Sequence, residues 1–116
     1  MHSIFNNHIL NETFIKGINY FNSSEFQEAH ISWEKIWKKG NAEDRKKVKG
    51  YIQLTAAIIN NIRKKKKASN YLFEKSINNI GENNFRNILN QDKLIDDIKS
   101  FHSKGRIRII VYNKSF

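Results

Sequence analysis

The sequence predicts an all-α protein, a single compact bundle of about five helices followed by an extended C-terminal tail. Three observations support this fold class. Apolar residues recur at the three- and four-residue spacing of amphipathic helices. Cap-forming residues and glycines divide the chain into helix-length segments, and the 116 residues include no proline. This length suits one domain over residues 1–116, with the tail at 106–116.

The first two predicted helices form an antiparallel hairpin. The first covers about residues 8–21, where Gly17 favours a close crossing by another helix, since glycine otherwise weakens a helix by about 1 kcal/mol. The second covers about residues 25–38. Ser24 is expected to open it as the first residue of a capping box, and Gly40 is expected to end it as a left-handed cap. Small and aromatic residues at the spacing of a single tetratricopeptide unit support this pairing.

The third helix is predicted to be the central one. It starts at Glu43 and Asp44, two acids that suit the positive pole of a helix, and runs to about Lys64. Residues 51–59 are apolar on every side, which indicates a helix with neighbours all around it. Gln53 is the only strongly polar side chain in that run, so a hydrogen-bond partner must accompany it into the core.

The remaining helices are shorter. A fourth is predicted over about residues 68–80, closed by Gly81, and a short one over residues 85–89. Asp92 is expected to cap a last helix that ends at Gly105.

The tail begins with a β-branched stretch over residues 106–112. A lone strand lacks a ladder partner, so three arrangements stay open: it lies extended across the helices, it pairs with a second copy of the chain, or it is mobile. Monomer and homodimer are therefore both compatible with the sequence.

Composition narrows the function classes. Cysteine is absent, which excludes disulfides and thiolate sites. No apolar run is long enough to span a membrane, and no membrane partner is expected. The N-terminal residues lack the pattern of a signal peptide, so we expect a cytoplasmic protein, or a stromal one if it is plastid-encoded. Neither a Ser-His-Asp pattern nor a phosphate-binding loop is present.

The second helix carries the most distinctive pattern of the chain. One face holds an aromatic stripe that includes a titratable ring, made of Phe26, His30, Trp33 and Trp37. Glu34 follows His30 by four residues, close enough on a helix for the two side chains to meet. A structural interpretation has the His30 ring bonded to Glu34 and Gln53, as a buried polar network that joins helix two to helix three.

A metal-dependent hydrolase-like site is the alternative, with His30 and Glu34 as ligands and Glu28, Glu25 or His8 completing the set. Zinc and iron sites need about three protein ligands and an open position, and no dependable third ligand is apparent. No cofactor is therefore predicted, and a divalent metal remains the alternative.

The two tryptophans allow two readings. Trp33 and Trp37 either belong to the core or line a ligand pocket between helices two and three that opens at Glu34. The core is the favoured reading.

The net charge is +10, from 21 Lys and Arg against 11 Asp and Glu. Such a field attracts nucleic acid or other anionic surfaces, although a chain rich in Lys, Asn and Ile also reflects A/T-rich codons. The basic residues fall at the two ends of helix three, about 25 to 30 Å apart at 1.5 Å per residue. One group is Arg45, Lys46, Lys47 and Lys49, and the other is Arg63, Lys64, Lys65, Lys66 and Lys67.

Several residues at fixed spacing resemble a known family. They are Gly17, Phe21-Asn22, Phe26, Glu28-Ala29-His30, Glu34, Trp37 and Gly50-Tyr51-Ile52-Gln53-Leu54-Thr55-Ala56. Over about residues 14–80 the chain is similar to the family called domain of unknown function 309, which comprises small all-helical proteins. Some members are labelled predicted metal-dependent hydrolases, and the resemblance implies that activity weakly. Ile31 stands where the family typically has a glutamate after the histidine, which weakens the hydrolase expectation here.

Overall fold

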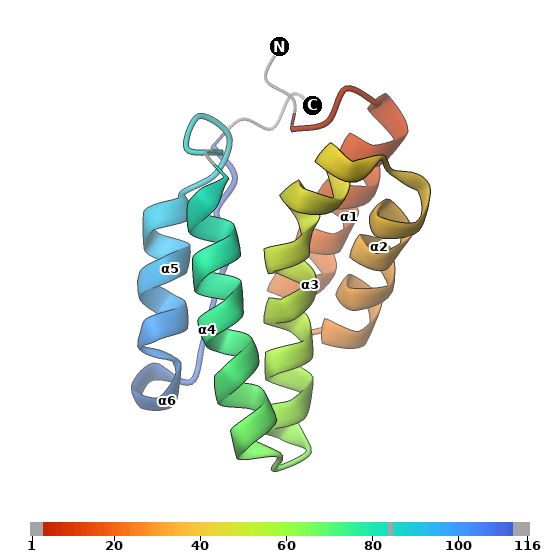
Figure 1. The fold of residues 1–116 in the computed structure, drawn as a ribbon. Coiled ribbons are helices and arrows are strands. Elements are labelled where there is room, and N and C mark those ends of the chain that lie inside the picture. The colour runs from red at the N-terminus through yellow and green to blue at the C-terminus, as the bar shows by residue number, and fades with distance from the viewer. Residues whose placement is uncertain (1–3, 84, 113–116) are drawn as a thin grey trace.

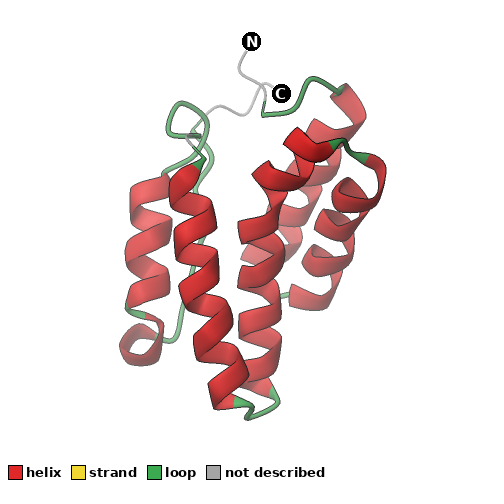
Figure 2. Ribbon diagram, viewed as in Figure 1, coloured by secondary structure: helices red, strands yellow, loops and turns green. Residues whose placement is uncertain are grey.

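The computed structural model describes residues 4–83 and 85–112, which form six helices (Figures 1 and 2). The predicted all-α class is confirmed. Consecutive long helices run antiparallel, and the fold has the radius of gyration of one compact domain, 13.2 Å. The helices are α1 (His8–Asn22), α2 (Phe26–Lys39), α3 (Ala42–Ile62), α4 (Lys66–Glu82), α5 (Gln91–Lys99) and α6 (Phe101–Lys104).

Helix α3 is central, as predicted. It packs against α2 on one side and α4 on the other, while α1 pairs with α2 as the predicted hairpin and α5 packs on α4 (Figure 1). At Gly17, α1 crosses α2 closely, as predicted. An added Cβ at this position would lie only 2.7 Å from Trp33 Cδ1. None of the helices in the described part of the chain is long and apolar enough to cross a membrane.

Two predicted caps of α2 are wrong. Ser24 does not cap α2: its backbone turns into the left-handed region at φ 61°, and Glu25, which has no side-chain cap bond, takes the N-cap position. Gly40 ends α2, but with an extended backbone at φ −81° and ψ 166°. Space explains the glycine there, because a Cβ would meet Asp44 Cβ and the Ile36 carbonyl oxygen at 2.5 and 2.8 Å.

The segment after α4 also departs from the prediction. Gly81 lies inside α4 rather than beyond its end, and the segment 85–89 is a turn instead of a short helix. The buried amide of Gln91 holds this turn in place: it accepts from the Phe85 backbone N–H and donates to the Ile80 carbonyl, both at 2.9 Å. Asn90, not Asp92, caps α5 through the Lys93 N–H.

Residues 106–112 of the tail lie extended across the helices, which is the first of the three arrangements, and residues 113–116 of the predicted tail lie outside the described residues. The tail leaves α6 at Gly105, whose φ of 67° confirms the expected left-handed cap. The Asn22 side chain then binds Ile109 twice, donating to its carbonyl at 2.8 Å and accepting from its N–H at 2.9 Å. Further along, Val111 forms an antiparallel bridge with Leu89. The tail therefore closes one side of the bundle.

An aromatic cluster fills the middle of the core. The ring of Phe14 lies 5.9 Å from that of Trp33 and 5.0 Å from that of Tyr51, and the Tyr51 and Phe85 rings stack at 6.4 Å. Tyr51 is fully buried, and its hydroxyl has no hydrogen-bond partner in the described structure. Burial raises the pKa of Tyr51 above the ordinary range of a tyrosine.

Removing this unpaired hydroxyl should stabilise the protein. An unsatisfied buried polar group carries a desolvation penalty of about 1–3 kcal/mol, so we expect Tyr51→Phe to raise the free energy of unfolding by about 1 kcal/mol in urea titrations at neutral pH. Above a pH of about 10 the unfolded chain releases the Tyr51 proton while the folded chain keeps it, so stability falls as pH rises. The Tyr51→Phe variant should show a shallower alkaline loss, and a lower stability of the variant at neutral pH would contradict this.

Candidate functional site

The His30 ring joins α2 to α3. Its Nδ1 atom lies 2.7 Å from the Thr55 hydroxyl on α3, and its Nε2 atom lies 3.5 Å from a carboxylate oxygen of Glu34, one turn further along α2. The His30 side chain is 19% exposed and that of Glu34 44% exposed, whereas Thr55 is fully buried. The cluster therefore extends from the buried Thr55 hydroxyl in the core to the Glu34 carboxylate at the surface.

The Thr55 hydroxyl has one hydrogen, and two neighbouring groups can accept it. The Thr55 hydroxyl lies 2.8 Å from the Ile52 carbonyl and 2.7 Å from His30 Nδ1. If it donates to the carbonyl, Nδ1 donates to its oxygen and Nε2 of a neutral ring has no hydrogen for Glu34; in the other tautomer the hydroxyl donates to Nδ1, and Nε2–H faces Glu34. Only the imidazolium donates to both neighbours at once. The ring therefore connects α2 to α3 through a hydroxyl that is fully buried.

The predicted partner Gln53 is not part of this cluster. Its carbonyl oxygen accepts from the side-chain amide of Asn79 on α4 at 2.6 Å. Helical geometry explains the correction, because Gln53 and Thr55 are about 200° apart around α3 and so face different neighbours. The amide does gain the required partner, but it ties α3 to α4, while Thr55 ties α3 to α2.

Loss of the Thr55 hydroxyl should therefore destabilise the fold. In Thr55→Val the methyl group replaces the hydroxyl at similar volume, and the His30 ring keeps its place with Nδ1 unpaired. We expect the free energy of unfolding to fall by about 1–3 kcal/mol, measured by urea denaturation. Thr55→Ser, which retains the hydroxyl, is the matched control; equal losses in the two variants would contradict the role given to the hydrogen bond.

The two tryptophans have different environments. Trp33 is a core residue with no exposed area, and its indole N–H donates to the Phe14 carbonyl at 3.1 Å. Trp37 is 39% exposed, which corrects its assignment to the core, and the Arg45 guanidinium lies 5.7 Å above its ring. Neither tryptophan ring lines either of the two cavities described below.

The residues considered as metal ligands are dispersed. His8 pairs with Glu12 at 2.7 Å on the exposed side of α1, and Glu28 and Glu25 are exposed near the start of α2. Among the described residues, no group of three or more His, Asp or Glu side chains is placed to share an ion. Ile31, at the position of the family glutamate, is 40% exposed and turned outward.

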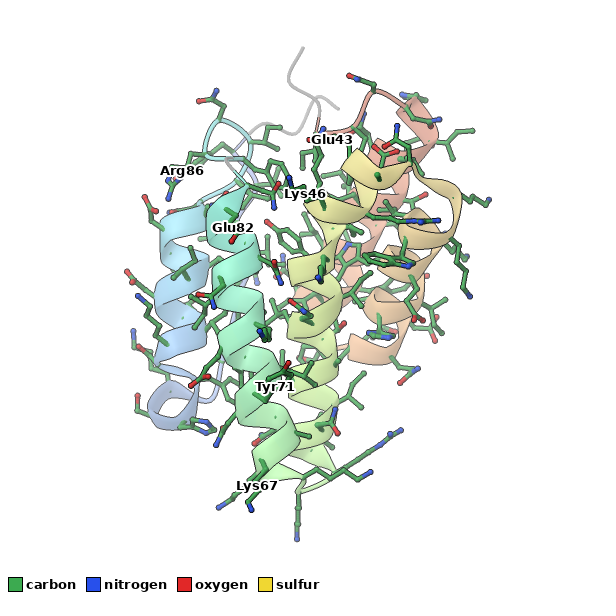
Figure 3. The ribbon with its side chains drawn as sticks, in the orientation of Figure 1. Glu43, Lys46, Lys67, Tyr71, Glu82 and Arg86 are labelled. Atoms are coloured by element: carbon green, nitrogen blue, oxygen red, sulfur yellow. The ribbon has the colours of Figure 1, made fainter. Side chains whose placement is uncertain are left out.

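The first basic group is partly engaged in packing. Arg45 donates to the Trp37 carbonyl at 2.9 Å, and Lys47 donates to the Ile4 carbonyl at 2.8 Å. Lys46, labelled in Figure 3, and Lys49 are exposed. Glu43 lies in the same region, at the upper end of α3 (Figure 3), so this group shares its surface with acidic side chains.

The second basic group is larger than predicted. Arg63 to Lys65 form the turn between α3 and α4, and Lys66 and Lys67 begin α4. All five side chains are exposed, and Lys67 projects from the lower tip of the bundle in Figure 3. Helix α6 and the start of the tail reach the same end, where Phe101 packs on Phe73 at 5.1 Å. We call the combined set the basic end: Arg63, Lys64, Lys65, Lys66, Lys67, Lys104, Arg106 and Arg108.

Three members of the basic end, Lys104, Arg106 and Arg108, are absent from the predicted group, because no local pattern indicates that the tail returns to the α3–α4 turn. The distribution of acidic residues is the one indication of this surface in the sequence. Neither residues 45–73 nor residues 98–116 contain an aspartate or glutamate. In the described part of the chain, no side chain of the basic end forms an ion pair with a carboxylate. The carboxylates near it are the exposed Glu25, at the start of α2, and Glu12, which lines a groove together with Arg108.

A cavity of about 220 Å³ opens beside the basic end. Its floor is apolar and largely aromatic, and Arg106 and Arg108 stand in its wall. The apolar lining residues come from α1, α2, α3, α6 and the tail, and they are Phe21, Phe26, Ile58, Ile62, Phe101 and Ile107. A second, more open groove of about 670 Å³ runs between α1 and the tail. The pocket expected between α2 and α3 at Glu34 is not one of these two.

Comparison with known proteins gives one match. The family model described as a domain of unknown function (DUF309) matches residues 14–70. No curated protein and no solved structure matches the chain. The matched region includes α1 from Phe14 onward, α2, α3 and the His30 cluster, and ends in the second turn of α4. The tail, with Lys104, Arg106 and Arg108, lies beyond it.

Proposed function

The chain belongs to the DUF309 family through residues 14–70, and on that premise we propose that it is a binding module whose basic end holds the phosphate backbone of a nucleic acid. One observation carries the proposal. The fold brings Arg63 to Lys67 and the tail cations Arg106 and Arg108, which are far apart in sequence and lie in carboxylate-free stretches, to one end of the bundle. Cations concentrated on one surface are the electrostatic footprint of nucleic-acid binding.

The charge distribution favours this end over the other. The basic end combines eight cations from the α3–α4 turn, the start of α4, the end of α6 and the tail, and among the hydrogen bonds and ion pairs of the described residues none involves the side chains of its lysines. At the opposite end Arg45 and Lys47 are bonded to backbone carbonyls, and acids are interspersed. The His30 cluster is a structural element in this proposal, since it braces the helices that carry the basic end.

Salt-dependent binding tests the proposal. We expect a fluorescently labelled oligonucleotide of about 20 nucleotides to bind with an affinity that falls at least tenfold between about 50 and 200 mM salt, because bound phosphates release counterions. Fluorescence anisotropy would measure it. In the variant Lys65→Glu, Lys66→Glu, Arg106→Glu the affinity should fall by a further factor of at least about ten.

A second triple variant supplies the control. Lys38→Glu, Lys39→Glu, Lys46→Glu changes the net charge by the same amount at the opposite end of the bundle, and it should retain affinity within about threefold. Equal losses in the two variants would show that only net charge matters and would overturn the proposal, as would undetectable binding by the unaltered protein.

A further inference from the structure

The cavity beside the basic end has aromatic walls that are held in fixed positions. The Phe21 and Phe26 rings meet edge to face at 5.2 Å, and Phe101 is fixed against Phe73. Phe21 is buried, whereas Phe26 is only partly buried, and both line the cavity. The Phe26 side chain therefore offers ring surface to a molecule in the cavity without rearrangement of the core.

The size of the cavity restricts what enters. Pockets for drug-sized ligands measure about 300–1,000 Å³, and this one measures about 220 Å³. It suits a single flat ring system more than a long chain or a folded cofactor. Arg106 and Arg108 are part of its lining, and the lining residue Ile62 directly precedes the basic segment Arg63–Lys67.

Four polar side chains line the cavity: Asn22, Ser24, Arg106 and Arg108. The Asn22 amide is held by the Ile109 backbone, to which it donates one hydrogen bond and from which it accepts another, while the aromatic rings and guanidinium groups supply the flat surfaces of the lining. A ring in the cavity would thus be held by contact with aromatic and guanidinium surfaces. Stacking of this kind accepts any base, because every base presents a π face.

We propose that this cavity receives one unstacked nucleobase while the basic end holds the adjoining phosphates, an inference that rests on the proposed function. A base is available only where it is free of a duplex, so the protein discriminates single strands from double strands. Recognition is tolerant of sequence where stacking dominates, because every base presents a π face.

Three ligands separate base insertion from electrostatic binding: a labelled oligothymidine, a backbone of the same length that carries abasic residues, and a duplex of that length. The unaltered protein should bind oligothymidine at least about fivefold more tightly than the abasic strand at equal salt. Phe26→Ala should remove this preference and leave duplex and abasic binding within about twofold. Tyr71→Ala, which removes an exposed aromatic ring on α4 outside the cavity, should keep the preference.

The outcomes distinguish this inference from the function on which it rests. If the abasic strand binds as tightly as oligothymidine, and charge reversal at the basic end still weakens both, base insertion is overturned and the proposed function stands. If no oligonucleotide binds but vesicles containing phosphatidylserine do, both are overturned. Should Phe26→Ala fail to fold by circular dichroism, Phe26→Leu, which keeps apolar volume and loses the ring, gives the same comparison.

Discussion

Replacing Gly50 with alanine is expected to lower the free energy of unfolding by about 3 kcal/mol or more, as expected for overpacking against groups that cannot yield. A Cβ at this position would lie 2.8 Å from the Ile80 backbone nitrogen and 3.2 Å from the Asn79 carbonyl carbon. Both are backbone atoms of α4, so relief requires α3 and α4 to separate. Their interface is the most extensive in the fold, and urea denaturation followed by circular dichroism would measure its weakening.

Gly81 provides the matched control for Gly50. It also lies within a helix, but the nearest atom to a Cβ there is Ile95 Cδ1 at 4.0 Å. Alanine should therefore gain helix propensity without a clash, and we expect Gly81→Ala to stabilise the protein by about 0.5–1 kcal/mol. If both variants changed stability in the same direction, close packing of α3 on α4 would not be the reason for glycine at position 50.

Trp33→Ala should be comparably damaging, with a loss of about 3–5 kcal/mol as for other large aromatic residues removed from a core. The indole packs against Phe14, Phe21 and Tyr51 at ring separations of 5.4–6.0 Å. Its removal leaves a void between α1, α2 and α3 and removes the indole hydrogen bond to the Phe14 carbonyl. Thermal and urea denaturation would both report the loss.

Two comparisons make the Trp33 result interpretable. Trp37→Ala, on the same helix but 39% exposed, should cost under about 1 kcal/mol, in the range of surface substitutions. Gly17→Ala should be destabilising alone but close to neutral when combined with Trp33→Ala, since the added Cβ then occupies vacated space. Additive losses in the double variant would contradict the direct contact between Gly17 and the indole.

The helices can be predicted from the sequence because each buries a stripe of apolar residues at helical spacing. Predicted and observed bounds of the first four helices agree closely, and the central position of α3 followed from its apolar surface. That same surface explains the error over Gln53. A helix that is apolar on every side gives no indication of which neighbour each face meets, so the amide was assigned to α2 when it faces α4. Thr55, a weakly polar residue, was overlooked as the partner of His30.

Long-range features were less accessible. The caps depended on backbone angles that Ser24 and Asn90 adopt in the folded turns, and several nearby residues had equivalent capping chemistry. The basic end required the tail to return to the α3–α4 turn. That path is set by Asn22 and by the pairing of residues 88–90, neither of which has a periodic signal. The cavity cannot be predicted from the sequence for the same reason, because its walls come from five separate segments.

The paired bonds between Asn22 and Ile109 have a consequence for energetic coupling. A single side chain replaces a neighbouring strand and tethers the tail to the end of α1, and the tethered segment is also one wall of the cavity. Detachment of the tail and opening of the cavity are therefore the same event. Any molecule held in the cavity binds only the docked tail, so its binding free energy adds directly to the stability of that docking.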